Sequence, residues 1–137
     1  TEIMRLKELP AGHAIGYGTT FRTSRPSRIA TLPVGYADGY DRLLSNNADV
    51  LVRGKRAPVV GRVSMDLVTI DVTDIAGVTV GDEVILIGEQ GGEIITANEL
   101  GLKSQTIGYE VLCRISARVP RLYPDQGAFR IRSRFAE

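Results

Sequence analysis

The chain has 137 residues, 43% of them hydrophobic and 24% charged, which fits one globular domain and excludes a disordered chain. Its 17 Lys and Arg residues almost balance 16 Asp and Glu residues, so the net charge of +1 gives no electrostatic footprint for nucleic-acid binding. Since no apolar run reaches the roughly 18–20 residues that cross a bilayer, we expect a single domain over residues 1–137 without nucleic-acid or membrane partners.

Short strands are predicted along most of the chain, from period-two alternation or runs of β-branched residues. They fall at residues 2–6, 15–21, 28–34, 49–52, 57–60, 68–73 and 83–87. Pro33 is expected at an edge or a bulge, because proline has no N–H to donate to a ladder. The segment Arg53-Gly54-Lys55-Arg56 predicts a hairpin turn that contains Gly54, and Gly91-Gly92 predicts another turn.

Two short helices are expected near the C-terminal end. Thr96 and Glu99 have the spacing of a capping box, which opens a helix through Leu102. Thr106 is the predicted cap of a second helix around residues 109–115, and extended chain returns at 119–123. The predicted fold is therefore all-β (mainly β): a small closed or nearly closed Greek-key-like β-barrel with two short helices.

The usual catalytic residue types are scarce. His13 is the single histidine and stands in a loop, where surface exposure is the simpler interpretation. Cys113 is the single cysteine, which excludes an internal disulfide and fits a reducing, cytoplasmic compartment. The acidic residues lack the spacing of a metal site, and we expect none. No glycine-rich phosphate loop of the required form is present.

Tyrosines in glycine-rich settings stand out instead. Tyr17 lies between Gly16 and Gly18, and Tyr36 and Tyr40 frame Ala37-Asp38-Gly39. Flanking glycines let a backbone approach another surface closely and leave the phenol exposed. The same glycines also fit ordinary turns with the tyrosine hydroxyls at the rim of the core. Composition alone leaves both interpretations open.

Five ordered motifs carry a family resemblance. They are Tyr17-Gly18-Thr19-Thr20-Phe21, the run from Arg28 to Tyr40, Gly61-Arg62-Val63-Ser64-Met65-Asp66, Val80-Gly81-Asp82-Glu83-Val84 and Thr106-Ile107-Gly108-Tyr109-Glu110, followed by Arg118-Val119-Pro120-Arg121. With them the chain resembles, up to about Tyr123, the C-terminal domain of bacterial alanine racemase. Members of that family are pyridoxal-phosphate enzymes that interconvert L- and D-alanine.

The resemblance implies a role for each matched position. Tyr17 matches the catalytic tyrosine that acts as the base on the L-alanine side. Met65 matches a residue whose backbone contacts the substrate carboxylate, and Tyr36 and Asp66 are grouped with it as substrate-binding, Asp66 by holding the local bend. The remaining matches are Arg42, Arg62 and Ile107 in the substrate entryway and Tyr109 at the cofactor phosphate.

A tyrosine base has a physical requirement. A free phenol has a pKa near 10, so about one in a thousand is ionised at neutral pH. A nearby cation is the most direct means of lowering that pKa, and arginine supplies one without competing for the proton. Which cation serves Tyr17 is not visible in the sequence.

The resemblance also implies parts that this chain lacks. Pyridoxal phosphate needs a lysine, whereas Lys7, Lys55 and Lys103 stand in a strand, a hairpin turn and a helix end. In the family that lysine belongs to an N-terminal pyridoxal-phosphate-binding (β/α)8 barrel, absent here. The start of the chain, without an initiator Met, suggests a fragment or a processed chain. The expected role is to supply Tyr17 across a homodimer interface, with D-alanine going to cell-wall peptidoglycan, and the fragment alone is expected to be inactive.

Two alternatives remain at this stage. The chain could be a non-catalytic β-barrel module for binding or regulation, in which Tyr17 would be dispensable. It could also belong to a racemase for serine or for a broader range of amino acids, because related racemases share the same domain.

Overall fold

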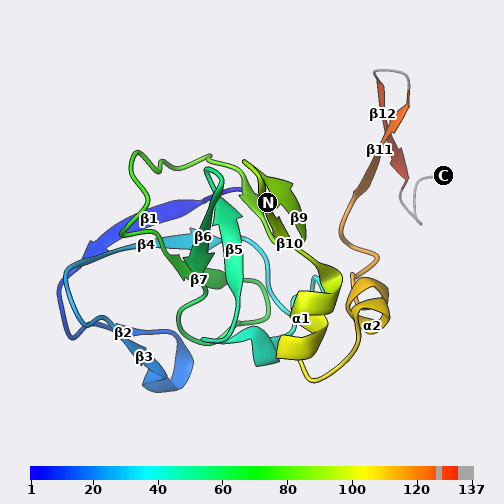
Figure 1. Cartoon of the computed structure of the whole chain (residues 1–137). Coiled ribbons are helices and arrows are strands. Elements are labelled where there is room, and N and C mark those ends of the chain that lie inside the picture. The colour runs from blue at the N-terminus through cyan, green and yellow to red at the C-terminus, as the bar shows by residue number, and fades with distance from the viewer. Residues whose placement is uncertain (126–127, 133–137) are drawn as a thin grey trace.

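The computed structural model describes residues 1–125 and 128–132, which are mainly β with two short helices (Figure 1). The predicted single domain over 1–137 also includes residues outside this described part. The strands are β1 (Arg5–Leu9), β2 (Ala14–Ile15), β3 (Phe21–Arg22), β4 (Ser27–Leu32), β5 (Asp49–Val52), β6 (Lys55–Pro58), β7 (Val68–Asp71), β8 (Val84–Ile85), β9 (Gly88–Gln90), β10 (Glu93–Ile95), β11 (Arg121–Asp125) and β12 (Ala128–Arg132).

The strands form small antiparallel sheets. In one three-stranded sheet β4 lies between β1 and β7, and in another β5 lies between β6 and β8. Two isolated antiparallel bridges connect them: Val59 with Ile70, and Glu2, before β1, with Glu83, before β8. Within the described residues these sheets do not close on each other, so the predicted closed or nearly closed barrel is not confirmed. Beside β8 the pairing continues only as a short stretch, in which the Ile3 N–H donates to the Asp82 carbonyl at 3.0 Å and the Val84 N–H to the Thr1 carbonyl at 2.9 Å. These contacts amount to one isolated bridge and not to a continuous ladder of the kind that closes a barrel.

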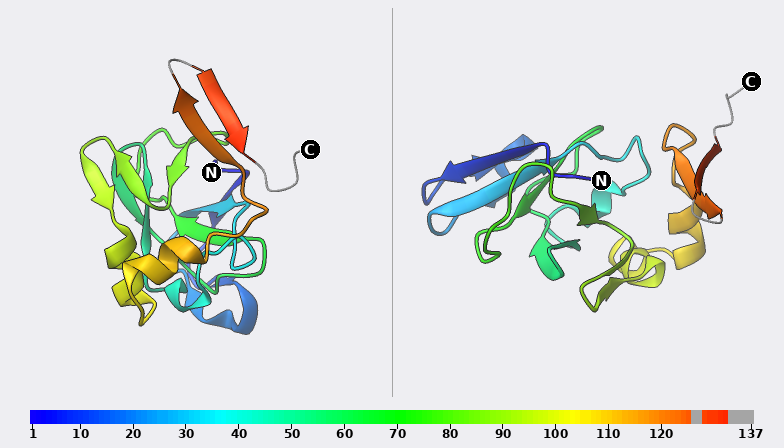
Figure 2. Two further views of the ribbon diagram at one scale, coloured as in Figure 1. Left: turned by 90° about the vertical axis from the view of Figure 1, so that its right-hand side faces the viewer. Right: turned by 90° about the horizontal axis from the view of Figure 1, so that it is seen from above.

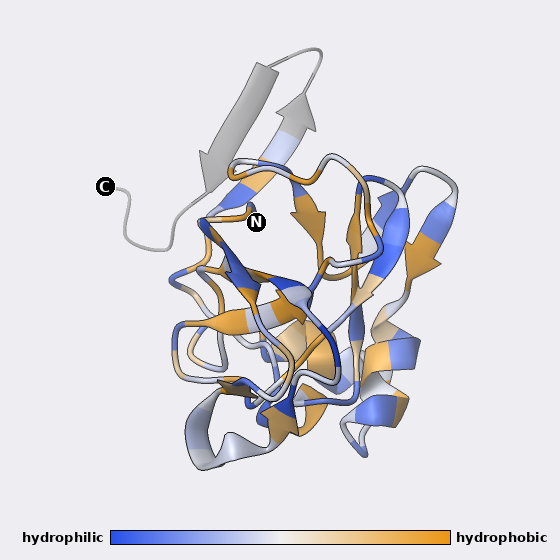
Figure 3. Ribbon diagram, turned by 90° about the vertical axis from the view of Figure 1, so that its left-hand side faces the viewer, coloured by the Kyte–Doolittle hydropathy of each residue, from blue (hydrophilic) through white to orange (hydrophobic). Residues whose placement is uncertain are grey.

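The core lies between these sheets. In β7, Val68 and Ile70 are buried and Thr69 and Asp71 are half-buried, which confirms the predicted alternation. Figure 3 shows hydrophobic and hydrophilic residues alternating along the strands, and both kinds along the helices. Burial of this apolar surface is the main stabilising contribution, at about 25 cal/mol per Å².

The predicted hairpin is confirmed, with a shorter turn. Only Arg53 and Gly54 separate β5 from β6, and both have positive φ angles, 51° and 72°. Two consecutive positive φ values are typical of the type I′ turn, whose twist matches that of paired strands. Lys55 and Arg56 therefore belong to β6 and not to the turn. The Gly91-Gly92 turn joins β9 to β10 as predicted.

Residues 15–21 do not form the predicted strand. The 3₁₀ turn η1 (Tyr17–Thr19) separates β2 from β3, because Gly16 and Gly18 have φ angles of 75° and 71° that an extended strand cannot contain. The first strand also begins later than predicted, at Arg5, and β4 ends just before Pro33.

The helices α1 (Ala97–Lys103) and α2 (Gly108–Cys113) pack against each other (Figure 1). The capping box is confirmed, since the Thr96 hydroxyl accepts a 3.0 Å hydrogen bond from the Glu99 N–H. The predicted Thr106 cap is wrong: Ile107 occupies the N-cap position of α2 and makes no side-chain capping bond. The two helices approach closely at Gly108, because a Cβ atom there would lie 3.1 Å from the Asn98 backbone nitrogen and would displace the Asn98 side chain.

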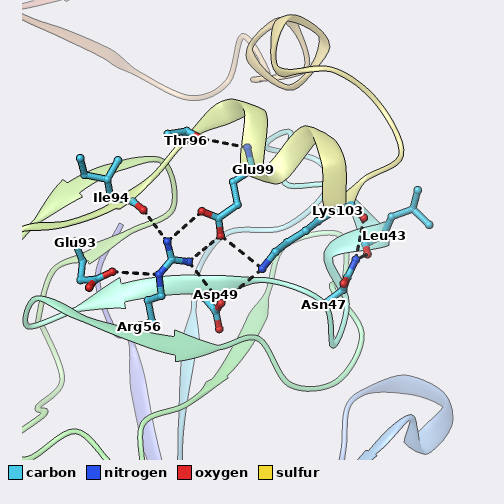
Figure 4. A network of polar contacts seen from close by, with 9 residues as sticks. All are labelled: Leu43, Asn47, Asp49, Arg56, Glu93, Ile94, Thr96, Glu99 and Lys103. Carbon is cyan, nitrogen blue, oxygen red and sulfur yellow. Dashed lines mark hydrogen bonds and ion pairs between the residues drawn. The ribbon is translucent and has the colours of Figure 1, made fainter.

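An ion-pair network ties α1 to the strands (Figure 4). The Arg56 guanidinium of β6 donates to Glu99 at 2.8 Å and to Glu93 at 3.2 Å. Asp49 lies within 3.6 Å of both Arg56 and Lys103. The hydrogen bonds from Arg56 lower the pKa of Glu99 below its usual range. The network fixes the orientation of α1 and therefore of α2.

The hairpin of β11 and β12 projects from the rest of the described chain (Figure 2). Arg121 secures its base, because its guanidinium donates to the carbonyls of Ile115, Ser116 and Val119. The extended chain predicted at 119–123 is confirmed from Arg121 onward. Neither the length nor the apolar character needed to span a membrane is found in any helix of the described residues.

Candidate functional site

A recess of about 430 Å³ opens beside η1 and collects most of the predicted site residues. Its walls come from four segments: η1, the turn after β4, the 3₁₀ turn at Arg42, and the loop before β7. The lining residues are Tyr17, Tyr36, Arg42, Arg62, Val63, Ser64, Met65, Asp66 and Leu67. Six of the eight predicted site residues therefore lie together.

Tyr17 stands at the rim of the recess with 76% of its surface exposed. A Cβ atom on the preceding Gly16 would lie 3.0 Å from the Arg62 backbone nitrogen, so this turn packs closely on the 61–62 backbone. The Arg62 Nε atom lies 3.7 Å from the Cβ position of Gly18. The phenol thus faces outward from a turn that is fixed beside a guanidinium.

The recess is electropositive. Within the described part of the chain, neither Arg42 nor Arg62 forms an ion pair. Arg42 is the first residue of the 3₁₀ turn η2 (Arg42–Leu44), which the Asp41 carboxylate caps by accepting from the Leu43 N–H at 2.8 Å. Two uncompensated cations beside the recess favour an anionic ligand.

The loop that carries Met65 is joined to the turn after β4 by the backbone. The Tyr36 N–H donates to the Ser64 carbonyl and the Ala37 N–H to the Met65 carbonyl, each at 3.0 Å. A Cβ atom on Gly35 would lie 2.3 Å from the Ser64 oxygen, so only glycine permits this approach. By contrast, the N–H of Met65 donates no hydrogen bond within the described residues and is available to a ligand.

Two residues without a predicted role, Asp38 and Arg118, complete the support of this loop. Arg118 Nε lies 2.7 Å from Asp38 Oδ1, and its Nη2 atom lies 2.7 Å from Asp66 Oδ1. The Asp38 carboxylate also accepts from the Gly35 N–H at 2.9 Å. The hydrogen bond from Arg118 holds the pKa of Asp38 below its usual range, which keeps the carboxylate ionised. The carboxylate of Asp66 is thus directed to Arg118.

The two other predicted residues, Ile107 and Tyr109, do not line the recess. They stand at the start of α2 and are 62% and 80% exposed. The chain after α2 is nevertheless attached to the recess, because the Ser116 N–H donates to the Asp38 carbonyl at 2.9 Å and Arg114 pairs with Asp41. The one sequence feature that could have identified Asp38 and Arg118 as site residues is that both lie in the matched motifs.

Among the described residues, the recess holds neither a group of metal ligands nor a lysine that could bind a cofactor covalently. In the part of the chain that the structure describes, no three His, Cys, Asp or Glu side chains are grouped so that they could hold a metal ion. None of the lysines lines the recess, and Lys103 is engaged with Asp49 and Glu99. His13 is exposed at a loop. The arrangement offers an exposed phenol, two arginines and a free backbone donor, which suits a small carboxylate with a transferable proton.

The fold and the site define a mainly β domain that presents a tyrosine-bearing, cationic recess at its surface. A family model described as "Alanine racemase, C-terminal domain" matches residues 1–123. The chain belongs to that family, which confirms the resemblance found in the sequence.

Individual relatives agree. An alanine racemase of Halothermothrix orenii is 60% identical over 126 residues, which are 92% of this chain and 33% of that protein. The crystal structure of alanine racemase from Bacillus anthracis with bound L-Ala-P has a TM-score of 0.90 at 41% identity, over 96% of this chain and 34% of that one. Alanine racemase from Bartonella henselae with covalently bound pyridoxal phosphate has a TM-score of 0.78 at 35% identity, over 84% and 31%. The chain spans about a third of the length of the relatives it matches.

Proposed function

We propose that this chain is the part of an alanine racemase that supplies the tyrosine base and the carboxylate contacts for interconversion of L- and D-alanine. The observation that carries the proposal is the recess itself, in which Tyr17 of η1 lies together with Arg62 and Met65 of the loop before β7. The proposal includes a cytoplasmic enzyme whose D-alanine goes to peptidoglycan.

Tyr17 is the proton acceptor in this proposal. Racemisation requires a proton to leave Cα on one face and return on the other, so a base that reaches one face of the substrate is sufficient for half of the reaction. The Tyr17 side chain is exposed, and its flanking glycines keep the backbone from obstructing an approaching surface. Arg62, whose Nε atom lies 3.7 Å from the Cβ position of Gly18 in the same turn, is the cation that we assign to stabilising a phenolate.

The substrate carboxylate has donors in the same recess. The Met65 N–H has no acceptor within the described chain, and Arg42 and Arg62 have no acidic partners there. A backbone donor and guanidinium groups bind a carboxylate more strongly than neutral groups do, because the hydrogen bonds are charge-assisted. The recess therefore favours a small amino acid bound through its carboxylate.

The cofactor must be held largely by another part of the protein. Bound pyridoxal phosphate supplies the electron sink that makes the Cα hydrogen removable. In this chain the exposed hydroxyl of Tyr109 fits a phosphate contact, and no lysine of the described residues reaches the recess to attach the group covalently. We assign that lysine to the part of the protein that corresponds to the other two-thirds of the relatives' length.

A second subunit completes the site in this proposal. The exposed apolar side chains on and beside α2 support a partner surface there. They are Leu102, Ile107, Tyr109 and Leu112, each at least half exposed. Tyr17 would then act on substrate held by the partner of a homodimer.

The test is Tyr17→Phe in the whole protein that contains this chain. General-base catalysis contributes about 10²–10⁴-fold, so racemisation of L-alanine should slow by at least about a hundredfold while cofactor absorbance is retained. Tyr123→Phe is the matched control, because Tyr123 is also exposed but lies outside the recess. Unchanged racemisation by the Tyr17 variant would remove Tyr17 as the base. Comparing the racemisation rates of L-serine and L-alanine in the same assay tests whether the protein prefers serine.

A further inference from the structure

Arg118 has no role in the site described so far, yet it contacts two of the segments that form or support the recess. Its single guanidinium binds two carboxylates from different loops, Asp38 after β4 and Asp66 before β7, each at 2.7 Å. The Met65 backbone lies directly beside the second of these contacts. Without Arg118, neither contact would form, and no cation would join the Asp38 carboxylate to the Asp66 carboxylate.

We propose that Arg118 is a positioning residue that fixes the Met65 N–H toward the substrate carboxylate by holding the 64–67 loop against the turn after β4. The inference rests on the proposed function for the identity of the substrate. The backbone bonds from Tyr36 and Ala37 set the distance between the two segments. The Asp66 contact sets the direction of the bend, because it anchors the residue that follows Met65.

Arginine suits this task for a geometric reason. Its planar guanidinium holds several N–H donors in fixed directions, so Nε and Nη2 can each bind a carboxylate at the same time. Lysine has one ammonium on a flexible stem and cannot fix both loops in the same way. The Asp38 carboxylate is itself held by the Gly35 N–H at 2.9 Å, so the bridge ends on a fixed group.

The same residue connects the recess to α2. Arg118 follows Ser116, whose N–H donates to the Asp38 carbonyl at 2.9 Å. Arg121, three residues later, fixes the intervening chain by donating to the Ser116 and Val119 carbonyls. Arg118 therefore lies where the segment that leaves α2 meets the loop that carries Met65.

The kinetic test uses Arg118→Gln in the whole protein. Loss of a carboxylate-positioning contact should raise the KM for alanine by about tenfold and change kcat by less than about threefold. Arg118→Lys should recover part of the loss, since it restores a charge without the fork. Arg25→Gln is the matched control: Arg25 is similarly exposed and pairs with Asp74 at 2.5 Å, outside the recess.

Amide hydrogen exchange gives a readout independent of activity. The Tyr36 and Ala37 amides should exchange about tenfold faster in Arg118→Gln than in the parent, because the loops part more often. If Arg118→Gln unfolds the protein, Asp66→Asn removes one contact and should accelerate the same two amides. Unchanged exchange in a folded variant, or a fall in kcat with KM unchanged, overturns the proposal. A parent protein without alanine racemisation refutes the proposed function, and amide exchange then decides on Arg118 alone.

Discussion

The contact between Gly35 and the Met65 loop permits a quantitative prediction for Gly35→Ala. The new Cβ atom would stand 2.3 Å from the Ser64 oxygen, and that oxygen must retreat by at least 0.7 Å to reach 3.0 Å. The Met65 oxygen, 2.4 Å from the same Cβ atom, must retreat by at least 0.6 Å. The hydrogen bonds from Tyr36 to Ser64 and from Ala37 to Met65, now 3.0 Å long, would then stretch to about 3.7 and 3.6 Å, beyond hydrogen-bonding range.

The energetic cost follows from these two effects. Forcing an extra methyl into a packed contact costs about 1–3 kcal/mol, and each lost hydrogen bond costs about 1 kcal/mol. Because moving the loop away relieves the steric clash at the expense of the hydrogen bonds, the two costs do not add in full. We expect a loss of about 2–4 kcal/mol in the free energy of unfolding. For 137 residues and about 2.1 cal/mol/K of unfolding entropy per residue, the Tm should fall by about 7–14 °C.

Thermal unfolding followed by circular dichroism measures this shift. Gly12→Ala is the control, because Gly12 has a φ angle of 81° but no atom within 4 Å of the new Cβ. That variant carries only the cost of the left-handed backbone, about 1 kcal/mol. A Gly35→Ala protein that melts within 2 °C of the parent, or no lower than the Gly12 variant, would refute the argued clash.

Two further predictions concern buried and paired groups. The Tyr40 hydroxyl is buried without a hydrogen-bond partner among the described residues, so Tyr40→Phe should raise the free energy of unfolding by about 1 kcal/mol in urea titrations, and destabilisation would contradict this. The Glu99 pKa lies below its ordinary 4.5 because of Arg56, so its stabilising effect is complete above pH 4.5 and lost as pH falls below it. Glu99→Gln should therefore lower the Tm at pH 7 and approach the parent's Tm at pH 3, and an equal difference at both pH values speaks against the pairing.

Local sequence signals determined most of the secondary structure. Alternation in residues 68–73, the hairpin around Gly54 and the Thr96 capping box depend on neighbours within a few residues, and all three are confirmed. The motifs likewise identified the family that the comparisons show. The strand expected at 15–21 failed because the φ angles of Gly16 and Gly18 turn the chain.

Whether the sheets close, and what supports the site, depended on contacts between distant segments. A period-two pattern indicates which side of a strand is buried but not which strand pairs with it. The predicted closure of the strands into a barrel therefore could not be settled by the pattern, and the structure shows small sheets instead. Arg118 is 80 residues from Asp38 in sequence, and no spacing rule connects them. The sequence by itself determined the local elements, the family and the residue types of the recess. Only the tertiary structure decided that one guanidinium joins its two loops, because that contact requires the folded approach of Gly35 to the Met65 backbone.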